Sequence, residues 1–203
     1  AFARYLNLPS HKVQSLITAA LLHDIGKAIG PDYLQMADHL AIPASLNALQ
    51  KTAKLAGEVS LWISQHCAHL DGSGVPKIAA RQIEKGSRML AIVNAYEKLT
   101  ASQAPKLGPL AASRQLLERT PHQLDAELLQ LFIKCIGIYP PGSVVKLSSG
   151  KLALVLENNA KKPLLPKVKV FYHSVHQHHI PPKILDLSRQ QEEQIDSCVD
   201  LKK

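Results

Sequence analysis

The stretch Leu21-Leu22-His23-Asp24-Ile25-Gly26-Lys27 ends an apolar segment with an imidazole, a carboxylate and a lysine. Upstream of it, apolar residues recur every three or four positions, which predicts a helix that begins at Pro9-Ser10 and has His23 and Asp24 on its last turn. Gly26 then offers a helix stop. Neighbouring helical side chains point about 100° apart, so both can face one ion only where a helix ends. The stretch therefore predicts a helical domain with reactive side chains at a helix terminus.

A second informative stretch is His66-Cys67-Ala68-His69-Leu70-Asp71-Gly72-Ser73-Gly74-Val75-Pro76, which leads from a predicted helix into a glycine-rich turn. Neutral imidazole nitrogens and carboxylate oxygens together suit divalent iron, manganese or zinc. His23, Asp24 and His66 are thus candidate metal ligands, and Lys27 could neutralise a phosphate oxygen. A His-Asp pair at a helix end is more often an ordinary hydrogen-bonded pair, so the pattern alone leaves both interpretations open.

Helical spacing of apolar residues continues through most of the chain. After the first helix it predicts further helices over residues 46–65, 78–100, 111–119 and 124–136. Gly and Pro clusters at 71–76 and 105–109 separate these segments. We therefore expect a mainly α fold, with a helical domain over residues 1–138. Because the first residue already falls within a helical pattern, we also expect the chain to be truncated at its N-terminus and to come from a longer protein.

The apolar period changes to two after Tyr139-Pro140-Pro141-Gly142. Alternation predicts three strands, at 144–147, 151–156 and 167–172, and the first two would form a hairpin around the turn at 148–150. Residues 180–203 are polar enough to predict a loosely held tail. Residues 139–203 are therefore expected to form a small C-terminal β extension with a polar tail.

Composition excludes several classes of protein. The 203 residues carry a net charge of +8, which would suit an anionic partner such as a nucleotide. Aromatic residues make up only 4% of the chain, so the stacking platforms of a nucleic-acid-binding protein are not expected. No apolar run of membrane-spanning length and no signal peptide is visible, so no membrane partner is expected. Three widely spaced cysteines fit reduced thiols, which indicates a cytoplasmic protein.

Three other features allow a functional and a structural interpretation. The histidine-rich segment 172–179 could bind a transition metal, but no carboxylate or thiol is close in sequence, and we favour a strand end that runs into an exposed loop. Cys67 could be a reactive thiol, but we favour an inert buried residue. Trp62 could stack on a guanine base, but we favour an anchor of the core.

Taken together, three motifs resemble a known family. Leu-Leu-His-Asp-Ile-Gly-Lys at 21–27 is similar to the motif of the HD superfamily of metal-dependent phosphohydrolases. Asp71-Gly72-Ser73-Gly74-Val75-Pro76 resembles the signature of its HD-GYP branch, in which Asp-Gly-Ser-Gly-Tyr-Pro is typical. Tyr-Pro-Pro-Gly-Ser-Val-Val at 139–145 resembles the extension that often follows such domains. The resemblance runs from residue 1 to about residue 190 and implies an HD-domain helical bundle from a bacterial signal-transduction protein.

The resemblance implies an activity and a set of site residues. Family members hydrolyse cyclic di-GMP with two or three metal ions, usually iron or manganese. His23 and Asp24 match the ligand pair that names the family, and His66 matches the first of two adjacent ligand histidines. Lys27 matches a lysine that contacts the phosphate. The loop 71–76 matches a signature associated with docking of diguanylate cyclase domains of the GGDEF type, although Val75 replaces the usual tyrosine.

Several family positions are changed in this chain. Cys67 replaces the second ligand histidine, Ala68 replaces a glutamate, and Asn94 replaces a ligand aspartate. Asn94 remains a candidate metal ligand, but its amide oxygen has no charge and bridges two cations poorly. The intermediate family histidine is lost, with Thr52-Ala53 nearest to its place and His39 a substitute at an unfavourable spacing. The upstream Glu and His ligands of the family would precede the first residue.

Charge arithmetic then limits the expected site. Two divalent ions bring four positive charges, whereas the visible ligands offer Asp24, with Asp71 as a second candidate. A dinuclear centre is therefore not expected, which leaves one ion on His23, Asp24 and His66 or an empty, purely structural site. We expect a degenerate member with weak or no hydrolysis that acts as a regulatory binding or interaction module. The alternative is an active cyclic di-GMP phosphodiesterase with a reduced metal centre, in which Lys27 and Asp24 are catalytic.

Overall fold

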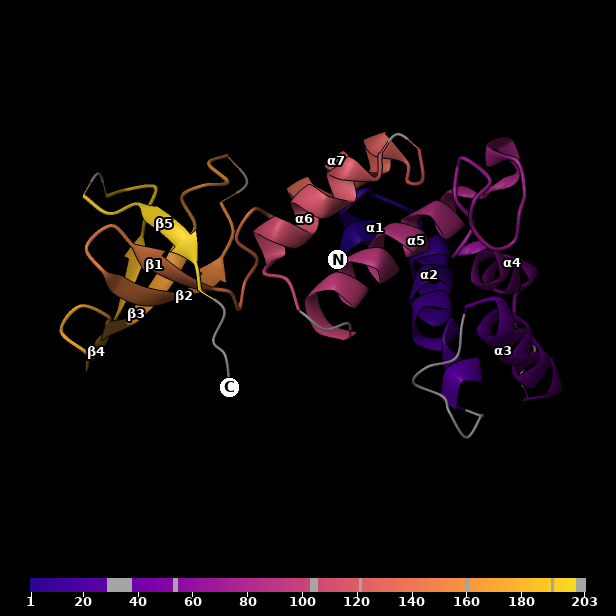
Figure 1. Ribbon diagram of the computed structural model, residues 1–203, viewed down its shortest axis with the longest axis horizontal. Helices are drawn as coiled ribbons and strands as arrows, with labels where there is room; N and C mark the ends of the chain where they lie inside the picture. Colours follow the sequence, from indigo (N-terminus) through magenta and orange to yellow (C-terminus); the bar gives the residue numbers. More distant parts are fainter. Residues whose placement is uncertain are drawn as a thin grey trace. The chain divides into compact units, whose positions relative to one another are not determined.

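The structure is a computed structural model that describes residues 1–28, 38–52, 55–102, 106–120, 122–159, 161–190 and 192–199, with only the backbone of Asp38, His39, Thr52 and Ser102. The chain divides into two compact units. One, which we call the helical unit, comprises Ala1–Glu97 and Leu116–Leu131, and the other, the sheet unit, comprises Lys98–Gln115 and Phe132–Lys203. Figure 1 shows the elements of both units along the chain.

Helices make up the first two thirds of the described chain, as predicted. The α-helices are α1 Phe2–Tyr5, α2 Ser10–Leu22, α3 Asp38–Thr52, α4 Gly57–Gln65, α5 Lys85–Glu97, α6 Pro109–Glu118 and α7 Ala126–Ile136. Short turns of other helix types are η1 Ile25–Ala28, η3 Ala80–Gln82 and η4 Lys98–Ser102. Helix α4 packs against α2, α3 and α5, and η1 packs against α3. Within the described residues, no helix is both long and apolar enough to cross a bilayer.

Trp62 of α4 is part of the core, as the sequence indicated. Its side chain is buried, and its ring lies against Gly86 of α5. A Cβ atom at position 86 would lie 2.3 Å from Cε2 of Trp62, so the two helices can approach this closely only with glycine there. The preferred interpretation of Trp62 as a core anchor is therefore confirmed.

Two helix predictions differ from the structure. The single helix expected over 46–65 is wrong, because it is split into α3 and α4, and Ala56 before α4 has an extended backbone with ψ of 138°. The helix expected over 78–100 begins only at Lys85. Ile83, just before this helix, also has an extended backbone, with ψ of 113°. Its side chain is buried although it lies outside the helix, so the apolar spacing here does not mark a helix. Helices α6 and α7 agree with prediction to within two residues at each end.

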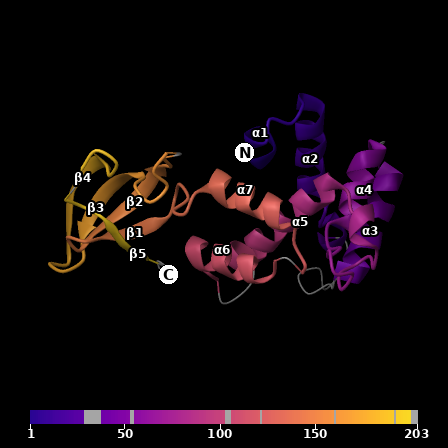
Figure 2. The ribbon, with the colours of Figure 1, turned by 90° about the horizontal axis from the view of Figure 1, so that it is seen from above.

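The C-terminal part forms one antiparallel sheet (Figure 2). Its strands are β1 Val144–Leu147, β2 Lys151–Glu157, β3 Lys167–His173, β4 His178–Asp186 and β5 Ile195–Cys198, in the order β4-β3-β2-β1-β5. Alternate residues of β1, β2 and β3 point into its core, among them Val145, Ala153 and Val168, each with no exposed surface. The mainly α fold with a small β extension is confirmed, and β1, β2 and β3 match the three predicted strands.

The polar tail expected over 180–203 is wrong, because its described part contains most of β4 and all of β5. Leu185 and Leu187 are buried in the sheet core, and β5 pairs with β1 through backbone groups, which need no apolar side chains. Pro181 and Pro182 lie in β4, where the pairing with β3 is irregular and the strand forms the sheet edge. Proline is tolerated at such positions because no ladder hydrogen bond is lost, which explains why the sequence concealed this strand.

Candidate metal centre

His23, Asp24 and His66 come together in the helical unit. One potential ligand atom from each residue lies within 4.8 Å of the others. His23 directly follows α2 and His66 directly follows α4, so the packing of these two helices places their C-terminal ends side by side. The two imidazole rings meet edge to face, with centroids 4.9 Å apart and planes at 82°. The three candidate ligands of the sequence analysis therefore converge on one point.

Both histidines are oriented by the backbone of their own helix. Nδ1 of His23 lies 2.9 Å from the carbonyl oxygen of Ala20, and Nδ1 of His66 lies 2.7 Å from that of Ile63. A carbonyl oxygen can only accept a hydrogen bond, so Nδ1 carries the proton in each neutral ring and Nε2 carries the lone pair. Metal-binding histidines in proteins are commonly fixed in this way by a second hydrogen bond.

Asp24 provides the negative charge of the site. Its Oδ2 atom lies 3.5 Å from Nε2 of His23 and 2.9 Å from Nζ of Lys27. Nε2 of His23 is buried and has no hydrogen-bond partner among the described residues. A nitrogen lone pair and a carboxylate oxygen repel each other at this distance unless a proton or a metal ion lies between them. The donor set therefore fits one divalent cation, with Lys27 as a second source of positive charge beside Asp24.

Ser45 of α3 fixes the turn that carries the ligand pair. Its side chain is fully buried, and its Oγ donates to the carbonyl oxygen of His23 at 3.1 Å. Oγ of Ser45 also accepts a hydrogen bond from the backbone N–H of Gly26 at 2.7 Å. Sequence reasoning missed Ser45, because a single serine within a helix belongs to no motif and is recognised only from its contacts.

Gly26 has a different role from the one predicted. Helix α2 ends at Leu22, and Gly26 lies inside η1, so it is not the helix stop. A Cβ atom at this position would lie 2.3 Å from the carbonyl oxygen of Ala41 and 2.5 Å from the backbone nitrogen of Ser45. Glycine is required here because η1 packs directly on the backbone of α3.

Gln65, next to His66, links α4 to the start of α5. Its side chain is 8% exposed. Its Nε2 donates to the carbonyl oxygen of Gln82 at 3.1 Å, and its Oε1 accepts from the backbone of Glu84 and from Oγ of Ser87, each at 3.0 Å. These bonds hold the end of α4, and with it His66, in place. The sequence offered no signal for this role, since glutamine is usually exposed.

Three positions at which the sequence analysis expected altered ligands lie directly after His66 or on α5. Ala68 is buried, so a side chain without donor atoms occupies the position where the resemblance implies a glutamate. Cys67 is partly exposed rather than buried as expected, and its carbonyl oxygen accepts a hydrogen bond from the backbone of Val75 at 2.9 Å. Asn94 is 7% exposed on α5, a helix that packs against both α2 and α4. The side chains of His39 and Thr52, and the whole of Ala53, lie outside the described residues.

The glycine loop at 71–76 is closed by its own polar groups. Oδ1 of Asp71 accepts hydrogen bonds from the backbone N–H of Ser73 at 2.9 Å and from its hydroxyl at 2.6 Å, and these bonds lower the pKa of Asp71. Gly72 has a φ of +76°, which favours glycine. A Cβ atom on Gly74 would lie 2.2 Å from the carbonyl oxygen of Cys67. Asp71 is thus an exposed turn residue outside the His-Asp-His group.

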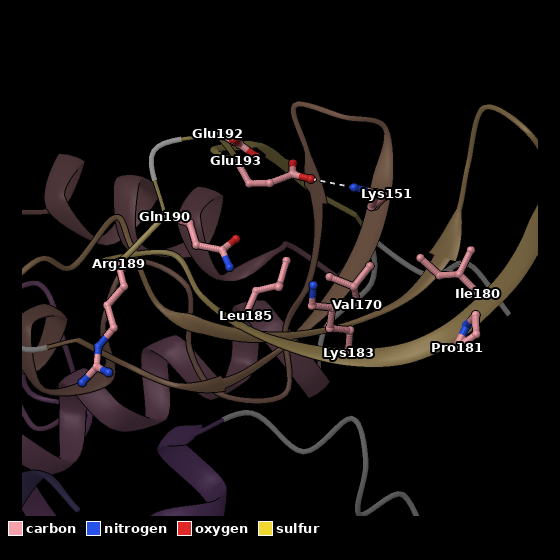
Figure 3. Close-up of a pocket in the computed structure, with 10 residues that line it drawn as sticks. All are labelled: Lys151, Val170, Ile180, Pro181, Lys183, Leu185, Arg189, Gln190, Glu192 and Glu193. Atoms are coloured by element: carbon pink, nitrogen blue, oxygen red, sulfur yellow. Dashed lines mark hydrogen bonds and ion pairs between the residues drawn. The ribbon is translucent and has the colours of Figure 1, made fainter.

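The sheet unit contains a separate pocket of about 710 Å³ (Figure 3). Its floor is apolar, with Val170 and Leu185, and its rim is charged. Nζ of Lys151 lies 2.8 Å from Oε1 of Glu193, and Nε of Arg189 lies 3.2 Å from Oδ2 of Asp186. Most of the positive charge around this pocket is therefore already neutralised. Its described lining residues include carboxylates but no histidine, so it does not resemble the site in the helical unit.

A helix-end His-Asp pair that meets a second histidine from a packed helix defines a candidate divalent-metal centre of a helical domain. Comparison with known families agrees with this class. The sequence model of the HD domain family matches residues 1–128. The chain therefore belongs to the HD domain family, which confirms the resemblance seen in its motifs.

Two curated relatives are similar to this chain. The cyclic di-GMP phosphodiesterase PA4108 of Pseudomonas aeruginosa is 36% identical over 203 positions, which cover 93% of this chain and 49% of that protein. The cyclic di-GMP phosphodiesterase PdeB of Borreliella burgdorferi is 24% identical over 181 positions, which cover 83% of this chain and 48% of that protein. The chain thus spans about half the length of the curated relatives it matches.

Proposed function

We propose that this chain is a cytoplasmic HD-GYP-like regulatory module that recognises cyclic di-GMP and hydrolyses it weakly or not at all. The observation that carries the proposal is the convergence of His23, Asp24 and His66 into a group with a single carboxylate. The relatives named as cyclic di-GMP phosphodiesterases support the choice of nucleotide. We assign the site to a domain over residues 1–138 and treat 139–203 as its β extension.

One ion, iron or manganese, would be held by His23, Asp24 and His66. When bound, such an ion polarises a phosphoryl oxygen and lowers the pKa of a coordinated water. The chain's own residues provide the rest of the recognition. The backbone carbonyls of Ala20 and Ile63 keep both histidines in the ligand tautomer, and Lys27 presents an ammonium group beside Asp24 for a phosphate oxygen.

The charge balance supports a single ion rather than a complete catalytic centre. The group His23, Asp24 and His66 includes one carboxylate, and the ammonium of Lys27 already lies 2.9 Å from it. Ala68 contributes no charge, and Asn94 could add only a neutral amide oxygen. A second divalent ion would therefore stand in a poorly compensated environment. Because hydrolysis in this class depends on paired ions, we expect it to be weak.

The second candidate is an active phosphodiesterase with a reduced centre. It is favoured by the position of Lys27, which places a phosphate-binding group directly against the ligand carboxylate. In that case His23→Ala would abolish hydrolysis of cyclic di-GMP, whereas in the regulatory module it would remove nucleotide-linked metal binding with little activity to lose.

The test compares the natural chain with a variant in which the family residues are restored, Cys67→His with Ala68→Glu and Asn94→Asp. We expect metal analysis to find about one ion per natural chain, with slow turnover of cyclic di-GMP. The triple variant should bind a second ion and hydrolyse faster, because it regains two carboxylates. Cys198→His, a change in the sheet unit, is the matched control. Two or more ions in the natural chain, together with rapid turnover, would overturn the regulatory proposal.

We also propose that the loop 71–76 contacts a diguanylate cyclase domain of the GGDEF type. Support comes from its construction, because Asp71 and Ser73 are exposed while their mutual hydrogen bonds give the loop a fixed shape. A pull-down with Ser73→Ala should recover less of such a domain than one with the natural chain. Equal recovery with the variant and with the natural chain would refute this contact.

A further inference from the structure

Three histidines gather at the tip of the β3–β4 hairpin, in the sheet unit. His173 ends β3 and His178 begins β4, and they are cross-strand partners, while His176 lies in the turn between them. The ring centroid of His173 is 4.5 Å from that of His176 and 5.8 Å from that of His178. The ring centroids of His176 and His178 are 6.1 Å apart. Three imidazoles therefore share one small area of surface.

The backbone beneath these rings is well fixed. Both the backbone N–H and the hydroxyl of Ser174 donate to the carbonyl oxygen of Gly150, at 2.9 Å and 2.6 Å. A Cβ atom on Gly150 would lie 2.7 Å from the side chain of Val175, so the turn packs closely on the neighbouring hairpin. Gln177 reverses the chain with a φ of +51°. The Cα positions of the three histidines are thus set by the fold. Their rings are joined only by long contacts, because the backbone N–H of His176 donates to Nδ1 of His173 at 3.5 Å and Nδ1 of His178 lies 3.4 Å from the carbonyl oxygen of His176.

We propose that His173, His176 and His178 form a second metal site, for a zinc-class ion. Imidazole nitrogens without a carboxylate suit Zn²⁺, Cu²⁺ and Ni²⁺ better than the harder ions Mg²⁺ and Ca²⁺. Cross-strand partners have Cα atoms about 4.5–5.5 Å apart, which allows two rings to reach one ion at Zn–N distances of about 2.0–2.1 Å. His176 would complete three protein ligands and leave one position to water.

Binding requires a local rearrangement of the rings. The planes of His173 and His178 are only 12° apart, so the two rings stack and must turn to direct one nitrogen each at a shared ion. His176 and His178 are exposed, so these rotations give up the long contacts of the His173 and His178 rings with His176 but disturb no core packing.

The charge that opposes a cation here is largely offset. Lys151 of β2 is the cross-strand partner of His173 on its other side, so its ammonium group is a positive charge to consider. Its Nζ lies 2.8 Å from Oε1 of Glu193, a pair drawn in Figure 3. The carboxylate of Glu193 therefore compensates the lysine. This site lies in the sheet unit and rests on no part of the proposed function.

The test is a Zn²⁺ titration of the metal-free full chain, followed residue by residue through backbone amide NMR signals. We expect the amides of 173–178 to shift and to saturate with one ion per hairpin, in addition to any change around His23 and His66. The double variant His173→Ala with His178→Ala should weaken binding at the hairpin at least tenfold. His179→Ala is the matched control, because this ring instead contacts Tyr172, with centroids 5.2 Å apart.

A second readout separates loss of binding from loss of folding. Zn²⁺ should raise the Tm of the natural chain and of the His179→Ala chain, by linkage of binding to the folded state. It should raise the Tm of the double variant by less, although the hairpin amides of the metal-free variant keep their dispersion. Unchanged hairpin affinity in the double variant, or Zn²⁺-induced shifts confined to the surroundings of His23 and His66, would overturn the proposal.

Discussion

The two histidine clusters of this chain use the same side chain in opposite ways. His23 and His66 are distant in sequence, largely buried, and each is held by a carbonyl oxygen of its own helix. His173, His176 and His178 are close in sequence, and their rings meet at the surface through one stacked pair and two long hydrogen-bond contacts. In the first cluster folding has already ordered the ligands, whereas in the second a bound ion would have to order them.

This difference shows that local density of histidine is a poor guide to a built metal site. The hairpin has more imidazoles within a few residues, but no carboxylate completes its cluster. The helical site has fewer histidines, but Asp24 brings a negative charge and Ser45 fixes the turn. Preorganised ligands give higher affinity because less conformational entropy is lost on binding.

The largest effect is expected from removing a metal ligand of the helical site. His66→Ala should lower the affinity of the helical site for Mn²⁺ by about a hundredfold or more. Removing a residue that only holds a ligand in place lowers metal affinity by about 10–100-fold, and removing the ligand itself should cost more. His178→Ala, a histidine of the hairpin, should leave Mn²⁺ binding at the helical site unchanged. Mn²⁺ titrations followed by electron paramagnetic resonance would measure both. Similar losses for the two variants would erase the distinction between the clusters.

The next effect concerns the packing beneath the helical site. Gly26→Ala should reduce the free energy of unfolding by about 2–3 kcal/mol, because the added Cβ meets the backbone of Ala41 and Ser45. Gly57→Ala is the control, since a Cβ there meets nothing within 4 Å, and it should stabilise by about 0.4–1 kcal/mol. Urea unfolding measures both. A harmless Gly26→Ala change would show that η1 does not need its close approach to α3.

A smaller effect is expected from replacing Ser45, which positions the turn that carries His23 and Asp24. Ser45→Ala leaves the carbonyl oxygen of His23 and the N–H of Gly26 without this buried partner, so stability should fall by about 1–2 kcal/mol. Affinity for Mn²⁺ should fall about tenfold, although Ser45 is no ligand. Ser64→Ala, which removes only a local bond to Leu61, is the control. Reduced stability with unchanged Mn²⁺ affinity would limit Ser45 to a structural role.

The smallest effect lies in the sheet unit and depends on pH. Burial raises the pKa of Glu193. The hydrogen bonds from Lys151 and Ser149, together with the positive charge of Lys151, outweigh burial and leave the pKa below its ordinary value. A carboxylate with a lowered folded-state pKa stabilises above its unfolded pKa of about 4.3 and loses this contribution as pH falls. Glu193→Gln should therefore destabilise by about 1 kcal/mol at pH 7.

The same variant should differ less from the natural chain at acidic pH, where both side chains are neutral. Thermal or urea unfolding at neutral and acidic pH would give the two differences. Glu192→Gln, at an exposed position on the rim of the same pocket, should change little at either pH. A constant difference across pH would mean that the Glu193 charge does not carry the effect. In the Glu193→Gln variant, Lys151 loses its carboxylate partner. Its uncompensated positive charge should therefore also weaken Zn²⁺ binding at the hairpin.

Prediction from sequence succeeded where the signal is local. The apolar period located α2, α6, α7 and the first three strands, because neighbouring residues share one face of a helix or strand. It failed at 46–65, where the same apolar pattern spans two helices, and at β4, where two prolines conceal an edge strand. At β4 the deciding contacts are backbone pairings with β3, which a pattern of side chains does not record.

The sequence by itself determined the family and the kinds of ligand available, because motifs such as His23-Asp24 and the loop 71–76 are contiguous and their chemistry does not depend on context. It also led to the expectation that ligands of the family are replaced at Cys67, Ala68 and Asn94. Only the tertiary structure decided that His66 meets the His-Asp pair and that Ser45 holds it. The reason is physical, since convergence depends on helix packing, and packing is a property of surfaces brought together by the whole fold.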